Sequence, residues 1–298
     1  MVTTSGGGFA LMVEGLSLSA MLESPLVIHL AQRPGPATGL PTRTEQGDLL
    51  FALHAGHGEF PRIIFTPGTP EDAFYLTQKS FNLADKYQIP VFVLTDQYFI
   101  DSYYNIPKFD LSGIKNEQHI VKTDKHYQRY KLTDSGISPR GIPGYGRGLV
   151  AVDSDEHDYE GHITEDLDIR SQMVDKRLRK MKNLRKEALL PEKIGPDNSS
   201  TLVICWGSTI NIVREALEHI NSVNTALLYF KQAFPLPERA ADLLKQAKKL
   251  IIVENNATAQ FAQILKYQFG VEIPNKILKY NGLSFSVEEL VSKLKKVI

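Results

Sequence analysis

The chain has 298 residues, of which 42% are hydrophobic and 23% are charged, and its 34 basic and 34 acidic side chains leave no net charge. This is the composition of an ordinary globular protein of about two domains. The balanced charge argues against a nucleic-acid partner, and no apolar run reaches the roughly 18 residues that span a bilayer. The single cysteine, Cys205, excludes a disulfide framework and any iron–sulfur site built from this chain alone, and we expect a cytoplasmic protein.

The sequence begins with the pattern of a strand end, a glycine turn and a helix. Val2 to Ser5 are predicted to end a strand, Gly6 to Gly8 to turn the chain, and a helical pattern runs from Phe9 to Met21. A helix that starts after such a turn presents free backbone N–H groups. The turn can therefore bind a ligand, or it can serve only to reverse the chain.

The segment RPGPATGLPTRTEQGDL, Arg33 to Leu49, carries the strongest functional signal. Its prolines and glycines exclude a helix or a central strand, and it follows an apolar run, Pro25 to Leu30, that predicts a buried strand. Loops at the carboxyl ends of parallel strands are where open α/β sheets bind ligands. Arg43 stands between two threonines and could hold a carboxylate through two parallel hydrogen bonds. The alternative is a surface loop with a solvated arginine.

Helices and strands then alternate, which predicts a parallel sheet with right-handed crossovers. The expected elements are a short helix from Leu49 to Leu53, a strand from Arg62 to Phe65, a helix from Glu71 to Lys86 that Pro70 starts, and a strand from Pro90 to Thr95.

Regular patterning fades from Asp101 to Leu149, and such a long connection is usually functional or interfacial. The acidic stretch Asp153 to Asp166 holds two histidines and could bind a divalent metal, but crowded carboxylates favour an interfacial turn instead. We expect Thr164 to cap a basic helix that runs from about Glu165 to Leu189. His54 and His57 lack a recognisable third ligand, so we expect no metal site in this chain.

A polar linker from Leu190 to Ser200 predicts a boundary between a domain at 1–189 and a second α/β domain at 190–298. The second domain is expected to contain strands at 201–205, 225–230, 250–253 and 277–280, and helices at 209–219, after Pro237, at 257–269 and at 287–297.

Several of these stretches resemble one protein family. GPATGLPTRTEQGDLL closely resembles the GPSTGxPT(K/R)xxQxDL segment of the alpha subunit of 2-oxoacid:ferredoxin oxidoreductases. TTSGGGFALMVEGLSLSAM is similar to the family's TSGPGxSLMxExxxxA, although Gly7 stands where the family usually has proline. The stretches EHDYEGHITED, WGST and VENNATAQFAQ also resemble family segments, and Ala259 stands where the family often has glycine.

The resemblance implies an α/β fold of two three-layer, parallel-sheet domains, a partial thiamine-pyrimidine-binding domain followed by a transketolase C-terminal-like domain. It implies that Arg43, with Thr42 and Thr38, contacts the substrate carboxylate. The turn at Thr4, Ser5, Gly6 and Gly7 would line the pyrimidine side of thiamine diphosphate. The implied activity is oxidative decarboxylation of a 2-oxo acid, with 2-oxoglutarate favoured, coenzyme A as co-substrate and ferredoxin as electron acceptor. Mg²⁺ and a 4Fe–4S cluster would lie on a beta subunit that shares the cofactor.

The resemblance also implies a preceding segment, about two or three strands long, that this chain lacks. We therefore expect low activity for the chain alone, and an unpaired edge on its first sheet. Two alternatives remain open. The chain could be a non-catalytic assembly fragment that binds the beta subunit, or a subunit of the 2-oxoacid dehydrogenase or transketolase type.

Overall fold

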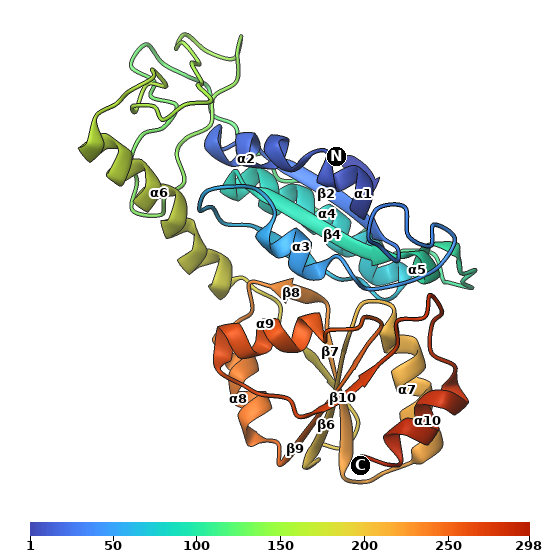
Figure 1. Ribbon diagram of the computed structural model, residues 1–298. Helices are drawn as coiled ribbons and strands as arrows, with labels where there is room; N and C mark the ends of the chain where they lie inside the picture. Colours follow the sequence, from blue (N-terminus) through green and yellow to red (C-terminus); the bar gives the residue numbers. More distant parts are fainter.

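The computed structural model describes residues 1–298 and contains two five-stranded sheets, each built mainly from one half of the chain (Figure 1). Each sheet lies between layers of helices, as expected. The first half also carries a lobe without helices or strands, built from most of residues 102–166, which projects beyond α2 (Val13–Met21) at the upper left of the view. No helix combines the length and the apolar character that crossing a bilayer requires.

The first sheet has the strand order β1-β2-β4-β3-β8, and its first four strands run parallel. The strands are β1 (Val2–Ser5), β2 (Leu26–Gln32), β3 (Ile63–Phe65), β4 (Pro90–Asp96) and β8 (Gln232–Phe234). The sequence did not predict β8, which is contributed by the second half and pairs antiparallel with β3. Three residues are too few to show a periodic pattern, so this strand depends on its partner. At the opposite edge, no strand of the chain pairs with the outer side of β1.

Helices cover both faces of the first sheet because alternate strand residues point to opposite faces. Helices α1 (Gly6–Ala10), α2 and α3 (Leu49–His54) pack on the face that includes Leu30 and Phe92, whereas α4 (Pro70–Tyr87) packs on the face that includes Val91. Thr69 caps α4 by accepting a hydrogen bond from the Asp72 N–H, as the Thr-Pro start favours.

The second sheet has the order β10-β9-β6-β7-β5. Its strands are β5 (Glu192–Ile194), β6 (Thr201–Trp206), β7 (Thr225–Phe230), β9 (Lys249–Glu254) and β10 (Asn275–Leu278). Helices α7 (Thr209–Ile220) and α10 (Val287–Leu294) cover one face, and α8 (Glu238–Gln246) and α9 (Gln260–Phe269) cover the other. The predicted linker contains β5, which pairs antiparallel with β7. The domain boundary between 189 and 190 stays a prediction.

Two further details differ from the expected elements. The first helix begins at Gly6 rather than Phe9 and is interrupted before Val13, so the glycines form a helical turn. The basic helix α6 (Leu167–Lys186) is capped by Asp166, whose carboxylate accepts hydrogen bonds from two backbone N–H groups. Thr164 was predicted in that role, but its hydroxyl accepts only from the Asp166 N–H, one position too early for the helix.

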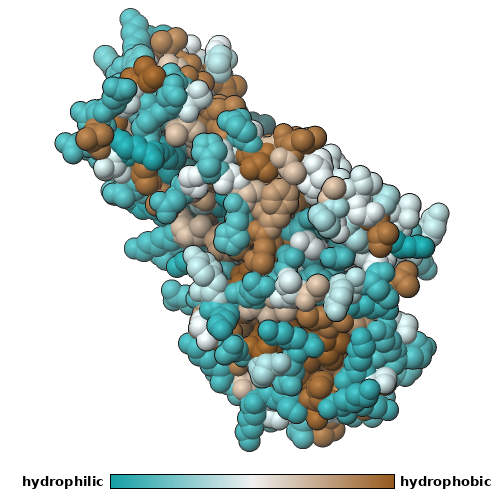
Figure 2. Space-filling view, in the orientation of Figure 1, coloured by the Kyte–Doolittle hydropathy of each residue, from teal (hydrophilic) through white to brown (hydrophobic).

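The surface is mixed in character. Hydrophobic side chains gather in a band between α2 and α3, whereas the irregular lobe carries single hydrophobic side chains among hydrophilic ones (Figure 2). Leu149 and Ile163 are among the exposed hydrophobic residues of that lobe.

Candidate functional site

The candidate site lies where β1, β2 and β4 end at the same edge of the first sheet. Ser5 pairs with Ala31 and Gln32 pairs with Asp96, so the three carboxyl ends finish at one level. The chain leaves this edge through three segments: the glycine turn into α1, the proline-rich loop that follows β2, and α5 (Gln97–Asp101). This is the edge at which the sequence predicted a ligand site.

A cleft of about 570 Å³ lies between α1 and the proline-rich loop. Its walls include Gly6, Gly7, Thr38 and Asp48, and a cleft of this size suits a small organic ligand. A Cβ at Gly7 would meet only the Ala37 carbonyl oxygen, at 3.8 Å, so the cleft is open beside this glycine.

Asp48 is an unexpected member of this wall. Its Oδ2 atom is buried without a hydrogen-bond partner, and burial raises the pKa of the carboxyl group to about 6. Its backbone N–H donates to the Gln32 side chain at 3.0 Å, which ties the end of the loop to the end of β2. A Cβ at Gly6 would lie 2.5 Å from Oδ2, so only glycine fits there without movement of Asp48.

A second cleft, of about 370 Å³, lies between the ends of β1 and β2 and helix α5. Thr4 and Thr42 line it, and Gln97 and Asp101 line it from α5. Ser5 and Arg33 line both clefts and therefore form the wall between them. Arg33 donates one hydrogen bond to the Pro41 carbonyl at 3.3 Å, which leaves most of its N–H groups free.

The structure brings most of the predicted site residues to these two clefts. Their lining includes Thr4, Ser5, Gly6, Gly7, Thr38 and Thr42. Arg43 lines neither cleft. Its Cβ and Cγ lie against Gly282 of the second half. A Cβ atom added to Gly282 would be 3.2–3.3 Å from them.

The sequence motif favoured Arg43 and not Arg33, although Arg33 is the first residue after β2 and belongs to the same loop. A residue at that position is carried to the carboxyl end of the sheet by the strand itself. The position of a basic residue directly after a predicted strand therefore indicates that its side chain lies near the ligand site.

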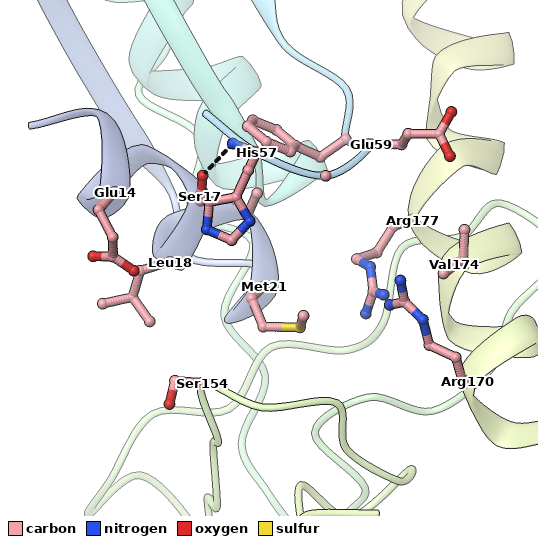
Figure 3. A pocket seen from close by; sticks show the side chains of 13 residues that line it. Glu14, Ser17, Leu18, Met21, His57, Glu59, Ser154, Arg170, Val174 and Arg177 are labelled. Atoms are coloured by element: carbon pink, nitrogen blue, oxygen red, sulfur yellow. Dashed lines mark hydrogen bonds between the residues drawn. The ribbon is translucent and has the colours of Figure 1, made fainter. Parts of the chain in front are cut away.

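The histidines considered for metal binding lie elsewhere. His57 lines a hollow of about 260 Å³ between α2, the loop after α3 and α6 (Figure 3). Arg170 and Arg177 reach this hollow from α6, and both pair with Glu156. His157 is buried against the ring of Tyr130. No group of three or more histidine, cysteine, aspartate or glutamate residues is arranged to hold a metal ion.

Two neighbouring glycines offer a matched test of the wall next to α1. Gly6→Ala forces its new methyl group against the Asp48 carboxylate, and we expect it to destabilise the protein by about 1–3 kcal/mol. Gly7→Ala meets only the 3.8 Å contact with Ala37, so we expect little change in stability. Urea denaturation of the two variants measures the difference. Equal midpoints would show that Asp48 moves freely and does not form a rigid wall.

Comparisons with known proteins agree with this architecture. The family model described as pyruvate flavodoxin/ferredoxin oxidoreductase, thiamine diphosphate-binding, matches residues 1–176. The alpha subunit of 2-oxoacid:ferredoxin oxidoreductase 1 from Sulfurisphaera tokodaii is 42% identical over 305 residues, which cover 99% of this chain and 48% of that subunit. The 2-oxoglutarate synthase subunit KorA from Methanothermobacter marburgensis is 28% identical over 299 residues, which cover 99% of this chain and 79% of that subunit.

A solved structure of the 2-oxoglutarate:ferredoxin oxidoreductase from Magnetococcus marinus, with 2-oxoglutarate, coenzyme A and succinyl-CoA bound, matches with a TM-score of 0.92. The two are 32% identical, and the match covers 99% of this chain and 52% of that chain.

The two mainly parallel sheets and the matched family model define an α/β protein of the thiamine diphosphate-binding oxidoreductase class. The chain belongs to the 2-oxoacid:ferredoxin oxidoreductase alpha-subunit family, which confirms the resemblance found in its sequence. It spans about half the length of the Sulfurisphaera tokodaii subunit.

Proposed function

We propose that this chain forms part of an enzyme that oxidatively decarboxylates a 2-oxo acid, with 2-oxoglutarate as the favoured substrate. The products are carbon dioxide and an acyl-coenzyme A thioester, and two electrons pass to ferredoxin. The observation that carries this proposal is the meeting of Arg33, Thr4 and Thr42 at the carboxyl edge of a parallel sheet, next to a glycine-walled cleft. A guanidinium group with neighbouring hydroxyls is suited to a carboxylate.

The residues of the glycine-walled cleft fit the pyrimidine side of thiamine diphosphate. The space beside Gly7 is open, and the unpartnered Asp48 carboxyl offers a polar group at its wall. Thr4, Ser5, Gly6 and Gly7 would contact the pyrimidine side. When bound, thiamine diphosphate supplies the electron sink that decarboxylation of a 2-oxo acid requires. A beta subunit would hold the diphosphate with Mg²⁺ and would carry a 4Fe–4S cluster.

Two arginines are candidates for the substrate carboxylate. The family resemblance proposes Arg43, assisted by Thr42 and Thr38. The lining of the cleft favours Arg33, because Arg43 packs on Gly282 instead. In either case, the chain's own contribution is to bind and orient the 2-oxo acid beside the cofactor and to exclude water from it.

The test is co-expression of this chain with a beta-type subunit, followed by an assay of one-electron dye reduction that depends on both 2-oxoglutarate and coenzyme A. Pyruvate and a branched-chain 2-oxo acid serve as competing substrates. Turnover that requires a 2-oxo acid supports the proposal, and the ratio of kcat/KM values identifies the substrate. A stable complex that binds neither 2-oxo acid nor thiamine diphosphate would favour the assembly fragment instead.

A further inference from the structure

Gln46, in the proline-rich loop, is fully buried and is held entirely by the second half of the chain. Its side-chain amide donates to the Trp206 carbonyl oxygen at 2.9 Å and accepts from the Asn255 N–H at 2.9 Å. Its backbone N–H donates to the Asn255 carbonyl oxygen at 2.7 Å, and its backbone carbonyl accepts from the Asn256 side chain at 3.2 Å. All four polar groups of this one residue therefore bond to the second sheet.

The place where Gln46 binds has a defined position in the second sheet. Trp206 ends β6, and Asn255 and Asn256 directly follow β9, which is the parallel neighbour of β6. The chain runs from β6 to β7 on one side and then returns to β9 on the other, so the strand order reverses between β6 and β9. The crevice at such a reversal is where α/β sheets bind ligands. In this protein, a residue of the first half occupies it.

The crevice is itself rigidly built. Glu254, at the end of β9, is fully buried, and its carboxylate accepts from the Asn256 side chain at 2.7 Å and from the Trp206 indole N–H at 3.2 Å. Two of the three residues that hold Gln46, Trp206 and Asn256, are thus themselves bonded to Glu254. Gln46 therefore binds to a preorganised site.

The second half of the chain also forms hydrogen bonds with the residues before and after Gln46. The Thr44 N–H donates to the Gly282 carbonyl at 3.1 Å. The Gln260 side chain donates to the Gly47 carbonyl at 2.7 Å and accepts from the Leu50 N–H at 2.9 Å. The loop is therefore anchored to the second half from Thr44 to Leu50.

The preceding part of the loop has no such anchors. Residues 35–43 are exposed, and the hydrogen bonds there stay within the loop: Leu40 N–H to the Pro34 carbonyl, Arg43 N–H to the Leu40 carbonyl, and the Arg33 side chain to the Pro41 carbonyl. The position of Thr42 in the substrate cleft thus depends on the anchored segment that begins two residues later.

We propose that Gln46 is a positioning residue. By binding in the crevice between β6 and β9, it fixes the position of Thr42 and of the neighbouring loop at the substrate cleft. This inference rests on the proposed function for its substrate, although not for the anchoring itself. If Gln46 acts in this way, the second half of the chain takes part in substrate binding although none of its residues lines either cleft.

The test is Gln46→Met, which keeps the length of the side chain and removes its two side-chain hydrogen bonds. The matched control is Gln232→Met. Gln232 is also buried and also joins the two halves, since its side chain accepts from the Leu189 N–H at 3.1 Å. It also donates to the nearby Pro235 carbonyl at 2.7 Å, and it lines neither cleft. Gln260→Met is a second test variant, because Gln260 is only half-buried and its loss is less damaging to folding.

Two measurements are made on the three variants. Amide hydrogen exchange is measured over residues 33–48, and KM for the 2-oxo acid is compared with KM for coenzyme A in the reconstituted enzyme. We expect Gln46→Met and Gln260→Met to speed exchange in the loop and to raise KM for the 2-oxo acid by about 10- to 100-fold, with KM for coenzyme A unchanged. Gln232→Met should change neither the exchange rates in the loop nor KM for the 2-oxo acid, even if it destabilises the protein as much as Gln46→Met does.

Wild-type exchange rates in the loop of both test variants would overturn the inference, as would equal changes in the control. If the wild-type enzyme does not turn over any 2-oxo acid, the proposed function fails. The exchange data then still decide whether the β6–β9 crevice anchors the loop.

Discussion

Arg33→Ala is expected to lower kcat/KM for the 2-oxo acid by about 100- to 1000-fold in the reconstituted enzyme, which corresponds to about 3–4 kcal/mol of transition-state stabilisation. The reason is geometric. Arg33 is the arginine that lines both clefts, and most of its N–H groups are unoccupied. Its loss removes the charged partner of the substrate carboxylate. Steady-state kinetics at several 2-oxo acid concentrations measure the change.

Arg43→Ala is the matched control in the same loop. The side chain of Arg43 contacts Gly282 and lines neither cleft, so we expect a change of only a few-fold. Arg33→Lys should recover part of the lost activity, because lysine keeps the charge but not the two parallel N–H bonds. A large loss in Arg43→Ala with little effect in Arg33→Ala would reverse the assignment and restore the residue that the sequence motif favoured.

The sequence predicted those features that depend on local pattern. Apolar runs such as Pro90 to Thr95 gave the buried strands, and the Thr-Pro pair gave the start of α4. The proline-rich loop could be placed at the carboxyl edge of the sheet because it follows a strand. Thr38 and Thr42 came with this loop, and the glycine turn after β1 supplied Thr4, Ser5, Gly6 and Gly7.

What the sequence could not show depends on contacts between distant residues. Gln46 is a polar residue in a polar loop, and nothing near it indicates that Trp206 and Asn255 bury it. Asp48 becomes an unusual carboxyl group only because the first turn of α1 lies over it. Strand β8 exists because β3 offers it an edge. These features arise when segments far apart in the chain meet, so no local period predicts them.

Glu23→Gln is expected to destabilise the protein by about 3–5 kcal/mol. Glu23 follows α2 and is 1% exposed, and its carboxylate pairs with Lys176 and with Lys180, the latter at 2.5 Å, both from α6. Arg129 of the irregular lobe donates to the Glu23 backbone carbonyl at 2.8 Å. A neutral amide would leave two buried ammonium groups without their counter-charge. Urea denaturation followed by circular dichroism measures the loss.

The dependence on pH separates this charge effect from a packing defect. Burial alone would raise the pKa of Glu23, but the ammonium groups of Lys180 and Lys176 lower it to about 2. In the unfolded chain, the pKa of a glutamate is about 4.3. The ion cluster therefore adds stability that is complete above about pH 4.3 and is lost as the pH falls toward 2. The stability curves of wild type and Glu23→Gln should converge in that range.

A constant gap between the two curves down to pH 2 would mean that the amide disturbs packing and that the charges contribute little. Glu272→Gln is the control, because Glu272 pairs with Lys266 in solvent. At every pH, the unfolding midpoint of this variant should equal that of the wild type. Since Glu23 follows α2 and both lysines belong to α6, convergence would also identify this cluster as a charge-dependent joint between these two helices.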